Sequence, residues 1–91
     1  MATVILTMRI MPESTETDLA QLEETVKQQI AEFGANFGKA EAKPIAFGLK
    51  ALEVIFTLDE SKGSTENLEN SIAALDEVNS AEIIDVRRAF G

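Results

Sequence analysis

The spacing of apolar residues changes several times along this chain, and this feature most restricts its fold. From Thr3 to Met11 the apolar positions alternate, which is typical of a strand with one buried face. That face carries Val4, Leu6, Met8 and Ile10. From Leu19 to Phe33 the apolar spacing becomes three and four, which predicts a helix. Asp18 is its expected N-cap and Gly34 its expected C-terminal stop.

The second half of the chain repeats the pattern with an extra strand. Asn36 to Lys43 is polar enough for an edge strand, whereas Leu52 to Leu58 is apolar and β-branched, as in a central strand. Residues Pro44 to Gly48 separate these two strands and predict a hairpin turn. We expect Ser64 or Thr65 to cap a second helix. Its buried face would carry Leu68, Ile72, Ala73 and Leu75, and its exposed side Glu66, Glu69 and Asp76.

A last strand is predicted from about Ala81 to Phe90. Its apolar residues Ile83, Ile84 and Val86 fall on both parities, so the pattern leaves open which face is buried and whether a bulge reconciles them.

The element order is strand, helix, strand, strand, helix, strand. It predicts an α+β fold of the ferredoxin-like βαββαβ type, in which two helices cover one face of a four-stranded antiparallel sheet. The first and third strands should be central because they are the most apolar. The hairpin turn and the C-terminus would then lie at opposite ends of the sheet. We expect one domain over residues 1–91.

Composition excludes several kinds of chemistry. The chain has no His and no Cys, which removes an imidazole base, a thiolate nucleophile and a zinc site with nitrogen or sulfur ligands. Carboxylates, lysines, arginines and hydroxyls remain, but the glycines Gly34, Gly38 and Gly48 are too scattered for a phosphate-binding loop. We expect no enzyme activity, no resident metal and no cofactor. The acidic pairs Glu23-Glu24, Asp59-Glu60 and Asp76-Glu77 are better explained by a structural or solubilising role than as cation ligands.

Charge and hydropathy restrict the partners and the compartment. A formal net charge of -8 opposes binding to phosphate backbones and anionic lipid, so we expect no direct nucleic-acid or membrane partner. No run of residues approaches the length and apolarity of a membrane span, and Met1 to Arg9 lacks the pattern of a signal peptide. These features predict a soluble protein, and the lack of Cys favours the cytoplasm, because a small secreted domain without disulfides would be unusual.

Two features are unusual for a purely structural domain. Phe47 is a large apolar residue in a turn, between Pro44 and Gly48, and it either faces outward or folds back over the sheet end. Arg87 and Arg88 are adjacent cations near the end of an acidic chain. Their alternative role is to keep the last strand soluble.

At these places the sequence resembles elongation factor 1-beta, in its short archaeal form. The matching segments are Met11 to Ser14, Pro44 to Leu49 with Ala51 and Leu52, and Asp85 to Arg88. The hairpin segment is the most specific of these. The resemblance implies a guanine-nucleotide exchange domain that binds the GTPase elongation factor 1-alpha and promotes exchange of GDP for GTP. Eukaryotic relatives carry an N-terminal extension, so this chain is expected to be the bare exchange module.

The resemblance also implies roles for individual residues. The aromatic residue of the hairpin motif, here Phe47, would dock on the second domain of the GTPase, together with Pro44, Ile45 and Gly48. A C-terminal lysine in eukaryotic relatives reaches the magnesium and phosphate site, and Arg88 aligns with it. Arginine differs from lysine in shape and reach, so the assignment between Arg87 and Arg88 is open.

The free chain is expected to be a monomer. The alternative function is that of a ferredoxin-like ligand-sensing or oligomerising domain without exchange activity, in which Phe47 simply packs.

Overall fold

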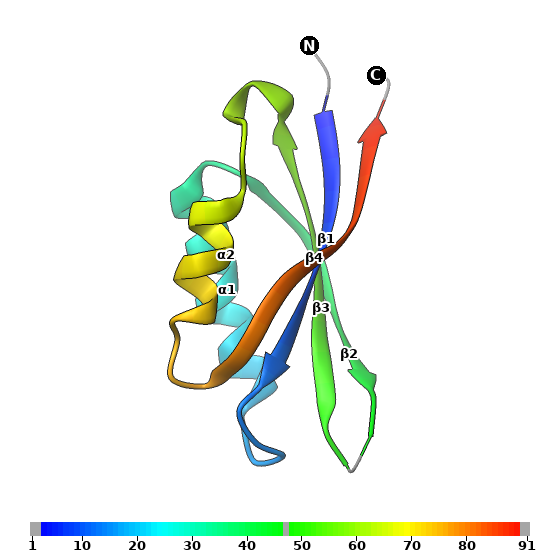
Figure 1. Cartoon of the computed structure of the whole chain (residues 1–91), viewed down its shortest axis with the longest axis vertical. Helices are drawn as coiled ribbons and strands as arrows, with labels where there is room; N and C mark the ends of the chain where they lie inside the picture. The colour runs from blue at the N-terminus through cyan, green and yellow to red at the C-terminus, as the bar shows by residue number, and fades with distance from the viewer. Residues whose placement is uncertain (1–2, 47, 90–91) are drawn as a thin grey trace.

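The computed structural model describes residues 3–46 and 48–89, and its elements follow the predicted order (Figure 1). Two helices lie on one face of a four-stranded antiparallel sheet, which confirms the ferredoxin-like prediction. The elements are β1 (Thr3–Pro12), α1 (Leu19–Phe33), β2 (Asn36–Pro44), β3 (Lys50–Asp59), the 3-10 turn η1 (Glu60–Lys62), α2 (Glu66–Ala73) and β4 (Val78–Ala89).

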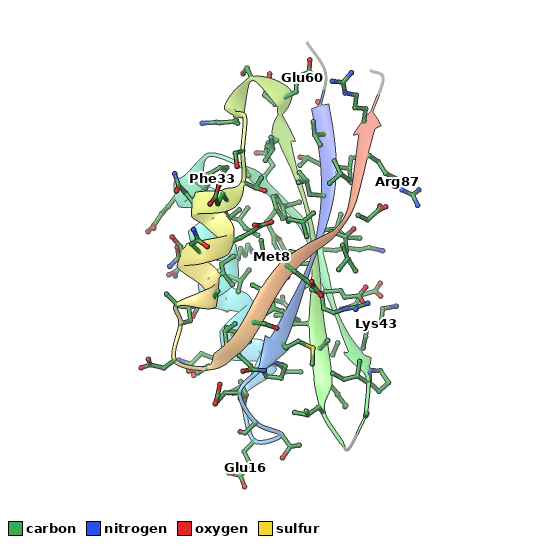
Figure 2. The ribbon with its side chains drawn as sticks, viewed as in Figure 1. Met8, Glu16, Phe33, Lys43, Glu60 and Arg87 are labelled. Atoms are coloured by element: carbon green, nitrogen blue, oxygen red, sulfur yellow. The ribbon has the colours of Figure 1, made fainter. Side chains whose placement is uncertain are left out.

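The sheet order is β2-β3-β1-β4, so the two most apolar strands are central, as predicted. Leu6 lies opposite Phe56 and Ile10 opposite Leu52, and paired residues project from the same face. This face packs on the helices and forms the core, in which Phe56 and Met8 are fully buried. Figure 2 labels Met8 between the sheet and the helices. The polar strand β2 lies at the edge, also as predicted.

Both predicted ends of α1 are confirmed. The Asp18 carboxylate accepts hydrogen bonds from the backbone N–H groups of Ala20 and Gln21. At the other end Gly34 adopts a φ of 96° and closes the last turn. Leu22, Val26 and Ile30 are buried along one face, which joins α1 to the sheet.

Helix α2 differs from the prediction in three details. Leu68 and Ile72 are buried as expected, but Ala73 is exposed because it ends the helix on the solvent side. Leu75 lies beyond the helix and packs half-buried against the core from the following turn. Glu69, expected to be exposed, is half-buried. Thr65 occupies the N-cap, and the Ser64 hydroxyl accepts the backbone hydrogen bond from Glu66.

Strand β4 begins at Val78, three positions before the predicted start, and a bulge explains its mixed parity. Met8 lies opposite Ile83 whereas Thr7 lies opposite Asp85, which leaves Ile84 as the extra residue. Ile83 therefore packs against the core, and Ile84 is 40% exposed. After the bulge Val86 shares the helix-side face with Leu6. It is nevertheless 60% exposed, because this end of the sheet extends beyond the helices (Figure 1).

Candidate functional site

The β2–β3 hairpin turn lies at one end of the long axis of the molecule, whose extents are 42 × 21 × 18 Å (Figure 1). The Ile45 N–H donates to the Leu49 carbonyl at 2.9 Å, and the Leu49 N–H donates to the Ala46 carbonyl at 2.9 Å. Gly48 adopts a φ of 76°, which an L-residue with a side chain rarely adopts. These bonds join the two strand ends that flank the turn.

The predicted partner-binding residues gather at this turn as far as the structure describes them. Pro44, Ile45 and Gly48 are exposed, and the apolar Ile45 side chain is 45% exposed. Phe47 lies outside the described residues, so its role as the docking aromatic residue stays a prediction.

The loop between β1 and α1 lies beside the hairpin at the same end of the sheet. A groove of about 340 Å³ separates the two segments. Its lining residues are Pro12, Ser14, Thr15, Thr17, Asp18, Leu19, Gly48 and Lys50. Sequence reasoning did not identify this groove, although the signal was available: the end of β1 must lie near the start of β3 when these central strands run antiparallel.

Arg87 and Arg88 lie at the opposite end of the sheet from the hairpin, but on opposite faces of β4. Arg88 pairs with Val4, whose side chain packs against the core, whereas Arg87 pairs with Ile5. Successive residues of a strand project to opposite faces, so Arg87 points away from the helices (Figure 2). The structure thus brings the two arginines to one end without bringing their guanidinium groups together.

Each arginine is paired with a different carboxylate. Arg87 Nε donates to Asp85 Oδ2 at 2.9 Å, within the same strand. Arg88 Nη2 lies 3.0 Å from Glu60 Oε2, which belongs to the η1 turn after β3. The sequence predicts a structural or solubilising role for Glu60, but it does not identify Arg88 as the partner, because the contact joins elements far apart in the chain.

Arg88 and Glu60 stand at the wall of a second groove, of about 410 Å³. Its other lining residues are Val4, Leu6, Leu58, Gly63, Ser64, Thr65 and Val86. The four aliphatic side chains make the groove partly apolar. This end of the molecule therefore combines exposed apolar surface with a cation that is tied to one acidic side chain.

The η1 turn that carries Glu60 is internally bonded. Asp59 Oδ1 accepts a hydrogen bond from the Ser61 N–H at 2.9 Å, and the Gly63 N–H donates to the Glu60 carbonyl at 3.2 Å. The hydrogen bonds from Ser61 hold the pKa of the Asp59 carboxyl below its usual value, because they favour the charged form. The backbone of Glu60 is thereby held near the end of β4.

The described part of the chain shows neither a metal-binding cluster nor a membrane-spanning helix. Residues 3–46 and 48–89 contain no group of three or more His, Cys, Asp or Glu side chains placed to hold a metal ion. Within the same ranges, neither helix has the length and apolarity needed to cross a membrane.

Solved structures with a similar fold have low sequence identity to this chain. A de novo designed protein, Foldit4, is 17% identical with a TM-score of 0.66, and each chain is covered to 98%. The ACT domain of a GTP pyrophosphokinase from Chlorobium tepidum is 14% identical with a TM-score of 0.59, covering 88% of this chain and 96% of that domain. At these identities the likeness shows the fold alone, and it gives no support to a ligand-sensing role.

Comparison with protein families and curated sequences is more specific. The family described as "EF-1 guanine nucleotide exchange domain" matches residues 5–89. The elongation factor 1-beta of Methanosphaera stadtmanae is 46% identical over 88 residues, which cover 97% of this chain and 98% of that protein. The elongation factor 1-beta of Methanobrevibacter smithii is 44% identical with the same coverage. The chain therefore belongs to the family of EF-1 guanine nucleotide exchange domains, and within it resembles the archaeal elongation factors 1-beta.

Proposed function

We propose that this chain, as a single exchange domain over residues 1–91, promotes the exchange of GDP for GTP on elongation factor 1-alpha during translation. The match to the exchange-domain family over residues 5–89 is the observation that carries this proposal. Such a role would place the chain in the cytoplasm, and we expect it to act as a monomer without a cofactor of its own.

Exchange requires differential binding rather than covalent chemistry. A factor accelerates GDP release when it binds the GTPase more tightly without nucleotide than with it, because a ligand shifts an equilibrium only through such a difference. No base or nucleophile is needed for this task. The absence of His and Cys from the sequence is therefore compatible with the proposed activity.

The hairpin end would supply the apolar contact with the GTPase. Ile45 is a large aliphatic side chain exposed on a hydrogen-bonded turn, and its burial against the GTPase would remove apolar surface from water. Phe47, Pro44 and Gly48 would complete this contact, with Phe47 as its aromatic anchor.

The arginine end would act on the nucleotide site. A guanidinium placed beside the bound magnesium competes electrostatically with the metal and disturbs the groups that hold the phosphates. Arg87 and Arg88 lie at the end of the sheet opposite the hairpin, so one contact can hold the GTPase while the other loosens its nucleotide.

The acidic surface would assist the encounter with the partner. At a net charge of -8 the chain is attracted to basic surfaces, and complementary charge mainly raises the association rate. The proposal therefore implies that association slows as salt is added.

The test is the release of a fluorescent GDP analogue from elongation factor 1-alpha, followed by stopped flow at increasing concentrations of the chain. We expect acceleration, and we expect Ile45→Ala and Phe47→Ala to raise the half-saturating concentration. Ile84→Ala is a matched control, because Ile84 is similarly exposed at 40% against 45% for Ile45 but lies on β4. No acceleration at micromolar concentrations would overturn the proposed function. Equal effects of the Ile45 and Ile84 changes would overturn the hairpin assignment.

A further inference from the structure

The acidic side chain of Glu60 holds Arg88 on the helix-side face of the sheet. The contact joins η1, which follows β3, to the end of β4, and its Nη2 to Oε2 distance is 3.0 Å. The Arg88 side chain is 65% exposed and that of Glu60 42%, so the pair lies at the surface. The contact therefore joins two residues that lie far apart in the sequence.

The position of Glu60 is set by its turn rather than by Arg88. Asp59 accepts a hydrogen bond from the Ser61 N–H, and Gly63 closes the turn with a φ of 77°. The turn directly follows β3, a central strand with a buried core face. The backbone that carries Glu60 is thus held by the turn, and its carboxylate offers an acceptor that the longer Arg88 side chain reaches.

One contact does not use up the hydrogen-bonding capacity of Arg88. A guanidinium carries five N–H donors in a planar fork, and the ion pair with Glu60 runs through Nη2. The other donors can still meet phosphate oxygens or a carboxylate of a partner. A guanidinium held by one nitrogen also loses less side-chain freedom when it binds.

Arg87 is placed differently. It projects from the opposite face and is bound through Nε to Asp85, two residues earlier in the same strand. A partner that meets the groove beside Arg88 therefore meets Glu60 and Val86 but not the Arg87 guanidinium.

We infer that Glu60 is a positioning residue for Arg88, and that Arg88 rather than Arg87 promotes nucleotide release. This inference rests on the proposed exchange function, and it names Glu60 as the residue that orients the Arg88 guanidinium for that function. Glu60 orients the Arg88 guanidinium over the groove before the GTPase arrives, so less ordering is needed in the complex.

The test separates the maximal rate of release of the fluorescent GDP analogue from the half-saturating concentration. Glu60→Gln should lower the maximal rate about two- to fivefold, the size expected for an exposed ion pair, with little change in half-saturation. Glu60→Asp, which keeps the charge, should restore part of the rate. Asp85→Asn is the matched control, because it breaks the other arginine pair of β4 and should leave the maximal rate unaltered.

A double-mutant comparison tests whether Glu60 acts through Arg88. In an Arg88→Ala background, Glu60→Gln should have no further effect on the maximal rate. Thermal unfolding of each variant, expected to match the parent closely, shows that folding is not the cause.

Several results would overturn the inference. It fails if Glu60→Gln leaves the maximal rate unaltered or raises it, or if its effect persists in the Arg88→Ala background. It also fails if Asp85→Asn slows release as much as Glu60→Gln. If the parent chain does not accelerate release at all, the proposed function itself fails and this inference with it. If the parent accelerates release and the Glu60 variants have the same maximal rate as the parent, only the positioning role is overturned.

Discussion

Replacing Gly34 with alanine tests how α1 is joined to the sheet. The Gly34 N–H donates to the Ala31 carbonyl and the Ala35 N–H to the Ile30 carbonyl, both at 3.0 Å, which is the paired bonding of a Schellman motif. The φ of Gly34 is 96°, in the left-handed region. A Cβ at this position would also lie 2.5 Å from Lys62 Nζ, so the lysine would have to move.

The expected magnitude follows from three contributions. A side chain in the left-handed region costs roughly 1–2 kcal/mol. Alanine also lowers the conformational entropy of the unfolded chain relative to glycine, which returns about 0.4–1 kcal/mol of stability. Displacing the Lys62 amine from the C-terminal end of α1 removes about 0.3–1 kcal/mol of favourable interaction with the helix dipole. The free energy of unfolding should therefore fall by about 1.5 kcal/mol, which lowers Tm by roughly 6–12 °C in a domain of this size.

Urea and thermal unfolding followed by circular dichroism measure both quantities. The Lys62→Ala variant separates the two causes: in that background Gly34→Ala should cost less, because no amine has to move. A Gly34→Ala variant that unfolds at the parent temperature or above would refute the argument from the left-handed cap. Equal costs in the two backgrounds would refute the part assigned to Lys62.

Two further predictions concern the sheet edge and the η1 turn. Gly38→Ala should destabilise the fold by about 1–3 kcal/mol in urea unfolding, because the new Cβ would lie 2.8 Å from the backbone oxygen of Ile55; an unchanged midpoint would contradict this. The folded-state pKa of Asp59 is lowered by its hydrogen bonds from Ser61, so its contribution to stability is complete above the ordinary pKa of an aspartate and is lost as pH falls through the lower folded value. The difference in unfolding free energy between the parent and Asp59→Asn should therefore be constant near neutral pH and shrink in acid, and a pH-independent difference would exclude this role.

The fold was predictable because local patterns agree with the tertiary arrangement. The alternation in β1 and the helical spacing of Leu22, Val26 and Ile30 each mark a face that is buried in the structure. Asp18 and Gly34 are strong local signals for helix ends, and both act as predicted. Such agreement between levels is what lets periodicity alone predict an architecture.

The end of α2 was less predictable. Ala73 and Leu75 fit a continued helix by spacing, but the helix stops at Ala73 and Leu75 reaches the core from a turn. Small residues such as alanine satisfy either environment, so their pattern does not distinguish a buried face from the last exposed position.

One part of the candidate site was predictable from the sequence and another was not. The hairpin was predictable because Pro44 and Gly48 enclose an apolar segment between two strands, which is a local signal. The contact between Glu60 and Arg88 was not predictable, since it depends on which strands are neighbours and on where η1 ends. The local pattern of charges does not predict which distant residue a charged side chain will pair with.

By itself, the sequence determined the order of elements, the central position of β1 and β3, the helix ends and the absence of imidazole and thiol chemistry. Only the tertiary structure decided which arginine faces the helices. The extra residue Ile84 shifts the register of β4 by one, and each one-residue shift exchanges the two faces of a strand. Arg88 therefore faces the helix side and meets Glu60, because the bulge is set by pairing with β1 rather than by the pattern within β4. The contact of Arg87 with Asp85, two residues earlier on the same strand, does not depend on the bulge.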